Sequence, residues 1–65
     1  MLIIVNGQEI DLNFNNVEEL LQHYQVLDKN IVVEKNGQLL NKEEYQQELL
    51  KKKDKIEIIA LVGGG

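Results

Sequence analysis

Leu2-Ile-Ile-Val5 runs into Asn6-Gly7 and then into the alternating stretch Gln8-Glu-Ile-Asp-Leu-Asn13. Asn-Gly between two such runs is the strongest short-range signal for a hairpin, because a type I′ turn needs positive φ at both of its central residues. Residues 2–13 are therefore predicted to form a β-hairpin at the start of the fold.

After Phe14 the hydrophobic period changes from that of a strand to that of a helix. The apolar residues that share one helical stripe are Val17, Leu20, Leu21 and Tyr24. Asn15 or Asn16 can cap the start, and the carboxylates that follow favour the helix dipole. We expect one helix of about ten residues, ended by the polar stretch after Leu27.

Two further strands are predicted in the middle of the chain. Residues 31–35 begin with three apolar β-branched residues, Ile-Val-Val, and a second Asn-Gly pair at 36–37 returns the chain into a short strand at 38–40. A charged turn at 51–54 leads to residues 55–62, which form the last and most apolar strand.

A short helical segment is expected between the second hairpin and the last strand. Asn41 and Glu44 have the spacing of a capping box, in which each side chain bonds the backbone of the other. We predict a helical turn or two within residues 42–50, with Tyr45 and Leu49 on the buried side.

The first and last strands are the most continuously apolar, as strands are when both faces are covered. We place them side by side at the sheet centre and the more charged strands at the edges. A helix crossing one face by a right-handed connection completes an α+β fold, a ubiquitin-like β-grasp with a mixed sheet of four to five strands. The domain is expected to span 1–62, with 63–65 as a flexible glycine tail.

Strand parity predicts an apolar patch on the face that the helix leaves open. If Ile3 and Val5 face the helix and Glu57 faces outward, the opposite face collects apolar side chains. A loop could cover them, but exposed apolar patches usually mark partner sites. We interpret the patch as a partner-docking surface made of Leu2, Ile4, Ile59, Leu61 and Val62.

Size and composition exclude several functions. A chain of 65 residues with no Cys and one His has neither a disulfide nor a metal to support a small core, and a deep cleft would remove volume from that core. An independent enzyme is therefore not expected. A net charge of −4 disfavours nucleic acid as a partner. No apolar run approaches the ~20 residues of a membrane helix, and the start does not resemble a secretion signal, so a cytoplasmic protein is expected.

Gly63, Gly64 and Gly65 follow the last strand. Three extended residues reach about 10 Å, and without Cβ atoms they can enter a channel that side chains would block. The α-carboxylate of Gly65 is the most distinctive reactive group, although it needs activation, usually as an acyl-adenylate formed with ATP. Terminal glycines can also be inert and frayed.

Three segments together resemble the ThiS family, the sulfur carrier proteins of thiamine biosynthesis. They are Ile3-Ile-Val-Asn-Gly7, Asn36-Gly37 and Ile58-Ile-Ala-Leu-Val-Gly-Gly-Gly65, and the resemblance covers the whole chain. It implies that a ubiquitin-activating-type adenylyltransferase consumes ATP to adenylate Gly65. A thiocarboxylate then forms with sulfur from a donor such as a cysteine desulfurase, and thiazole synthase receives that sulfur. Gly63 and Gly64 would form the tail that enters these partners.

The resemblance also implies a protein co-substrate that is not itself an enzyme, binds no cofactor or metal, and is a monomer when alone. One position departs from the family pattern: members often have Gly-Asp before the last strand, where this chain has Lys53-Asp54. His23 is interpreted as a surface residue, and Lys51 to Lys53 as a solvated turn.

Two alternatives remain open from the sequence. The small subunit of molybdopterin synthase has a similar Gly-Gly end, although it is usually longer. A non-covalent ubiquitin-like interaction module would instead use the docking surface, with the glycines inert.

Overall fold

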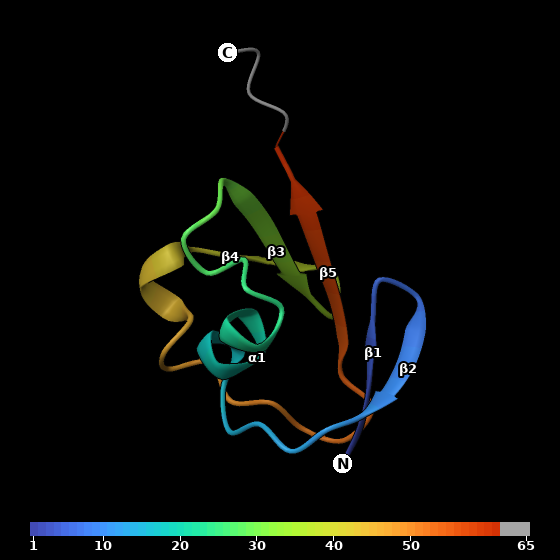
Figure 1. Ribbon diagram of the computed structural model, residues 1–65. Coiled ribbons are helices and arrows are strands. Elements are labelled where there is room, and N and C mark those ends of the chain that lie inside the picture. The colour runs from blue at the N-terminus through green and yellow to red at the C-terminus, as the bar shows by residue number, and fades with distance from the viewer. Residues whose placement is uncertain (62–65) are drawn as a thin grey trace.

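The computed structural model describes residues 1–61, and its elements follow the predicted order (Figure 1). The first hairpin is β1 (Leu2–Val5) and β2 (Gln8–Asp11), followed by helix α1 (Val17–His23). The second hairpin is β3 (Ile31–Lys35) and β4 (Gln38–Leu40). A 3₁₀ turn, η1 (Lys42–Glu44), precedes the last strand, β5 (Lys55–Ala60).

The five strands form one mixed sheet in the order β2-β1-β5-β3-β4. β1 and β5 are parallel neighbours, as predicted, and the other pairs are antiparallel. The expectation that all other strands are edges is wrong for β3, which lies between β5 and β4. The charge of Lys35 did not mark an edge, because its Nζ is paired with Glu48 Oε2 at 2.7 Å.

Both predicted Asn-Gly turns are confirmed. Asn6 and Gly7 have φ of 50° and 79°, and Asn36 and Gly37 have φ of 52° and 82°. These left-handed conformations are those of a type I′ turn, and Asn and Gly adopt them at lower cost than other residues.

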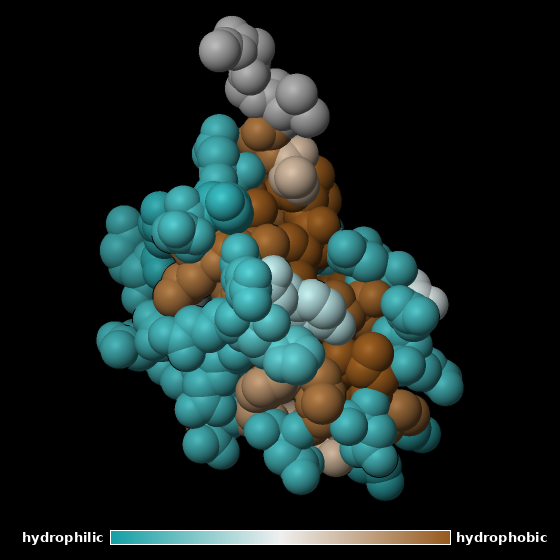
Figure 2. All heavy atoms as spheres, in the orientation of Figure 1, coloured by the Kyte–Doolittle hydropathy of each residue, from teal (hydrophilic) through white to brown (hydrophobic). Residues whose placement is uncertain are grey.

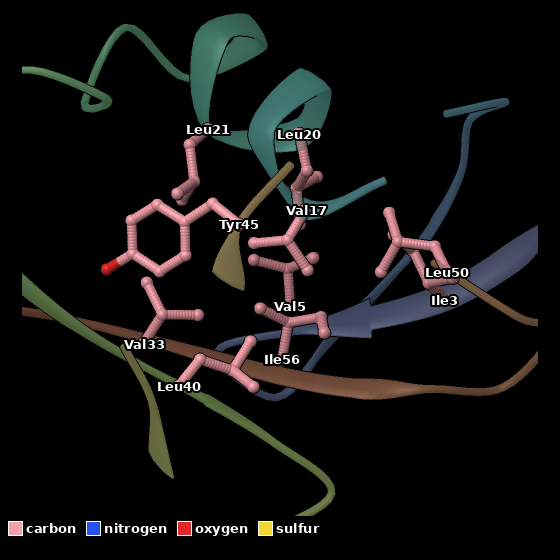
Figure 3. Close-up of a cluster of buried hydrophobic side chains, with 10 residues drawn as sticks. All are labelled: Ile3, Val5, Val17, Leu20, Leu21, Val33, Leu40, Tyr45, Leu50 and Ile56. Carbon is pink, nitrogen blue, oxygen red and sulfur yellow. The ribbon is translucent and has the colours of Figure 1, made fainter. Parts of the chain in front are cut away.

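One face of the sheet packs against α1 and forms the core (Figure 3). Val17, Leu20 and Leu21 are fully buried, and each such side chain stabilises the fold by roughly 1.5–3 kcal/mol relative to an exposed position. The same cluster contains Ile3, Val5, Val33, Leu40, Tyr45, Leu50 and Ile56. Burial raises the pKa of the Tyr45 hydroxyl above its usual value of 10.0.

The helix is shorter than predicted, seven residues instead of about ten. It begins at the Asn16 cap, whose side chain accepts a hydrogen bond from Glu19 N at 2.9 Å. It ends in a Schellman motif, in which Gln25 N donates to Gln22 O and Val26 N donates to Leu21 O, both at 3.0 Å. The sequence concealed this end because the left-handed position, φ 60°, holds Gln25 rather than glycine.

Tyr24 was expected on the buried stripe, and this is wrong: it is the C-cap residue and is 39% exposed. The helix turns away before a fourth apolar residue can reach the sheet.

The segment after β4 contains less helix than predicted. Glu44 Oε1 accepts a hydrogen bond from Asn41 N at 2.7 Å, as in a capping box, but the helical turn covers only Lys42–Glu44. Tyr45 is buried, whereas Leu49 is 60% exposed and Leu50 takes the core position. An isolated bridge to Asn16 makes the backbone extended at Leu49, so neighbouring side chains alternate between faces and a helical spacing from Tyr45 no longer applies.

Candidate functional site

β5 is the strand that precedes the glycines. It begins in the middle of the sheet, and its last residues extend past the first hairpin (Figure 1). β1 pairs with β5 only at Ile4↔Lys55 and Val5↔Ile56, whereas β3 pairs with it as far as Ala60. On the β3 side, the Leu61 N–H donates a hydrogen bond to Asn30 O at 2.9 Å. The predictions for Val62, Gly63, Gly64 and Gly65 concern residues outside the described part of the chain.

Asn6 extends the contact between the first hairpin and β5 beyond the end of β1. Its backbone N–H donates to Ile56 O at 2.8 Å. Its side-chain Oδ1 accepts from Ile58 N at 2.7 Å, and its Nδ2 donates to Ile58 O at 3.3 Å. The amide therefore occupies the place that one more residue of β1 would take beside β5.

Asn36 plays a similar part on the opposite side of β5, at the first residue of the strand. Its N–H donates to Lys55 O at 2.8 Å, and its Oδ1 accepts from Lys55 N at 2.9 Å. The sequence predicted both Asn residues as turn formers only. The signal for their second role is that Asn, unlike Asp, offers a donor and an acceptor together.

A buried carboxylate fixes the start of β5. Asp54 is 7% exposed, and it accepts hydrogen bonds from Asn36 Nδ2 at 2.9 Å and from Lys51 N at 2.7 Å. Lys35 Nζ lies 3.9 Å from its Oδ2. A buried charge is tolerable only when it is paired and hydrogen-bonded, and these partners meet that condition.

Lys53 stands where members of the family often have a glycine, just before the last strand. Lys53 has φ of 70°, in the left-handed region that favours glycine. The turn type implied by the family pattern is therefore kept, with a lysine in the strained position.

The alternation of side chains along the strands correctly predicted which apolar residues lie on the sheet face opposite α1. Ile59 and Leu61 are 45% and 46% exposed, so no part of residues 1–61 covers them fully. Leu2 and Ile4 are half-buried on the adjacent strand, and Val32 lies directly opposite Ile59. The sequence missed Leu39, which is 61% exposed on the edge strand of the same face. That these residues dock a partner stays a prediction.

Acidic residues flank this apolar surface. Asp11 and Glu9 on β2 lie opposite Leu2 and Ile4, and Glu57 lies opposite Glu34. Cross-strand partners share one face of a sheet, so the carboxylates and the apolar residues point the same way. Such a surface is complementary to an apolar patch with a basic rim.

His23 is exposed and contacts the rings of Phe14 and Tyr24, with centroids 5.3 and 5.1 Å away. Within residues 1–61, no three His, Cys, Asp or Glu side chains gather closely enough to hold a metal ion. The helices of this same part of the chain are too short to cross a membrane.

Comparison with known proteins identifies the family. The sequence model of the ThiS family matches residues 3–65. The chain belongs to the ThiS family. The sulfur carrier protein ThiS of Bacillus subtilis (strain 168) is 33% identical over 98% of this chain and 100% of the relative. The crystal structure of the thiamine biosynthesis protein ThiS from Geobacter metallireducens is also similar, with a TM-score of 0.85 and 32% sequence identity. The match covers 100% of each chain.

These matches confirm the resemblance to ThiS and the ubiquitin-like β-grasp fold. A further relative is the thiazole synthase of Paramagnetospirillum magneticum (strain ATCC 700264 / AMB-1). It is 35% identical over 100% of this chain, which spans only 20% of that longer protein.

Proposed function

We propose that this ThiS-family protein carries sulfur as a thiocarboxylate on the carboxyl group of Gly65. Membership in the family makes it a sulfur carrier of thiamine biosynthesis, as the sequence predicted. The observation that carries the proposed chemistry is that the family match runs through the three glycines to residue 65.

The chemistry requires an activated carboxyl group. A carboxylate is a poor electrophile, so a ubiquitin-activating-type adenylyltransferase transfers AMP from ATP to the Gly65 carboxylate and releases pyrophosphate. A sulfide equivalent from a donor such as a cysteine desulfurase then displaces AMP, which exchanges a C–O bond for a C–S bond. In this scheme the partner enzymes supply every catalytic group, and the chain acts as a co-substrate.

The fold supports this role by holding the last strand from both sides. Asn6 and Asn36 bond the backbone of β5, and the Asp54 carboxylate, next to the first residue of the strand, accepts a hydrogen bond from Asn36. The three glycines beyond it have no Cβ to obstruct a narrow channel. A fixed β5 leaves less conformational entropy for a partner to remove when it binds this strand.

Thiazole synthase is the proposed recipient of the sulfur. A protein of that name contains a region similar to this entire chain, which supports a functional association between the two. The similar structure from Geobacter metallireducens is named as a thiamine biosynthesis protein, which also favours this recipient over molybdopterin synthase. Co-purification with thiazole synthase, and not with the large subunit of molybdopterin synthase, is the expected result.

The decisive experiment is intact-mass spectrometry after incubation with the adenylating enzyme, ATP and a sulfur donor. The full chain should exchange one terminal oxygen for sulfur, and a chain that lacks Gly65 should not. Unchanged mass of the full chain would contradict the proposal. Unchanged biological activity after removal of Gly64 and Gly65 would favour the non-covalent module instead.

The docking surface (Leu2, Ile4, Ile59, Leu61 and Val62) is proposed to seat the adenylating enzyme. An Ile59→Glu change should weaken binding by about tenfold or more, because it buries an unpaired charge in an apolar contact. Leu39→Glu is the matched control, since Leu39 is also exposed on this face but lies on the edge strand, two strands from β5. Equal effects of the two changes would contradict the assignment.

A further inference from the structure

The end of β5 has an open edge on the side of the first hairpin. In an antiparallel pair, every second residue directs its N–H and C=O toward its neighbour and the residues between direct theirs away. Leu61 N bonds Asn30 O on the β3 side, whereas Ile58 N and O bond the Asn6 side chain on the other side. By this alternation the N–H and C=O of Ala60 point toward the β1 side.

No strand occupies that side of Ala60 within residues 1–61. The ladder between β1 and β5 ends at Val5↔Ile56, and Asn6 extends it only to Ile58. In Figure 1, β5 continues past the turn of the β1–β2 hairpin, and on that side no ribbon lies beside its end. Ala60 therefore presents a free donor and acceptor at the edge of an otherwise central strand.

This edge lacks the usual protection against pairing with another chain. Exposed edges normally carry charged residues, proline or bulges. The outermost strand β2 has Glu9 and Asp11, but Ile58-Ile59-Ala60-Leu61 has no charged residue. Figure 2 shows hydrophobic residues over this part of β5. An unprotected edge with free hydrogen-bonding groups fits an extended peptide segment, which would add as a strand.

We propose that the enzyme that activates the carboxyl terminus adds an extended segment of its own chain to this edge of β5. The segment would accept from Ala60 N–H, donate to Ala60 C=O, and lie in line with β1 above the Asn6 turn. This inference rests on the proposed function and supplies its geometry: main-chain pairing sets the direction in which β5 enters the partner, while the docking surface supplies apolar contact.

A second copy of this chain is the less favoured occupant. Each chain carries a net charge of −4, and pairing two β5 strands would bring the acidic surfaces around Glu57 and Glu9 toward each other. Repulsion between like charges opposes that association.

Amide hydrogen exchange tests the proposal directly. In the free protein, Leu61 N–H should exchange slowly because it bonds Asn30, and Ala60 N–H should exchange fast. On saturation with the cognate adenylating enzyme without ATP, Ala60 N–H should become protected. A complex in which Ala60 still exchanges fast would overturn the edge but leave the carrier function intact. Failure to form any complex would overturn both. Concentration-dependent protection in the free protein would show self-pairing and overturn the proposed occupant.

Removing the single N–H gives a second, independent readout. A synthetic chain with an ester in place of the Ala60 amide, and the Ala60→Pro variant, should each bind the enzyme about tenfold more weakly through the loss of one hydrogen bond. Ala60→Ser keeps the N–H and should bind within about twofold of the parent, the margin allowed for a small surface substitution. Unweakened binding of the ester chain would overturn the proposal, because that change leaves the side chain in place.

Discussion

The two Asn-Gly turns have the same sequence and the same backbone conformation, yet they support different ends of β5. Asn36 bonds the first residue of the strand and the buried Asp54. Asn6 bonds Ile58, near the end of the strand, and its bonds are exposed to solvent. A hairpin signal in the sequence can thus conceal a tertiary role, and that role depends on what lies beside the turn.

The two asparagines therefore support β5 in different ways. Asn36 belongs, with the buried Asp54, to a polar network that positions the start of β5. The Asn6 side chain makes the last described contact between the first hairpin and β5. Disrupting the first should cost mainly global stability, and disrupting the second should affect mainly the local order of the strand end.

The largest expected effect comes from Asp54→Ala. It leaves Asn36 Nδ2 and Lys51 N–H without their acceptor in a site that is 7% exposed. The free energy of unfolding should fall by about 2–3 kcal/mol, as measured by urea denaturation. Asp11→Ala is the control, because the Asp11 side chain is 79% exposed, and it should change stability by less than about 0.5 kcal/mol. A loss for Asp54→Ala as small as that expected for the control would show that the Asp54 network is not important for folding.

Asn36→Gly should lower the free energy of unfolding by about 1–2 kcal/mol. Glycine keeps the left-handed turn, so the change isolates the two side-chain bonds, one of them to the buried Asp54. Thermal and urea unfolding measure it. A loss equal to that of Asp54→Ala would mean that Asp54 acts mainly through Asn36.

Asn6→Gly should cost less, about 0.5–1 kcal/mol, because its bonds are exposed and water replaces them. Its distinctive result is local: Ile58 N–H should exchange with solvent faster, whereas Lys55 N–H should not. Asn36→Gly should show the reverse pattern. If either change accelerates both amides equally, the division between the two ends of β5 is wrong.

The smallest expected effect is a gain. Lys53→Gly should stabilise the protein by about 0.5 kcal/mol, since relief of the left-handed strain at φ 70° exceeds the extra freedom of glycine in the unfolded chain. Lys52 has an ordinary φ, so Lys52→Gly should destabilise the protein slightly. A loss of stability with Lys53→Gly would show that the lysine is not strained there.

Much of the fold was predictable because it depends on local patterns. The two Asn-Gly pairs determine hairpins through their own φ preferences, and the spacing of Val17, Leu20 and Leu21 predicts a buried helical face. Alternation along β1 and β5 also placed Ile59 on the open face. The ending Val62-Gly63-Gly64-Gly65 indicated the family, which the comparisons confirm.

The errors arose where long-range contacts replaced local preference. Gln25 ends the helix in a conformation that its own propensity does not favour, and the bridge to Asn16 shifts Leu50, not Leu49, into the core. Local rules cannot foresee such choices, since the free energy that decides them comes from packing between distant segments.

By itself, the sequence determined the hairpins, the buried stripe, the β-grasp order and the glycine ending, because each follows from residue types that are neighbours along the chain. Only the tertiary structure decided which turn amide holds which end of β5, that Asp54 is buried with its partners, and that the edge beside Ala60 is open. These features join residues up to 52 positions apart, and only the folded backbone brings such groups within hydrogen-bonding distance.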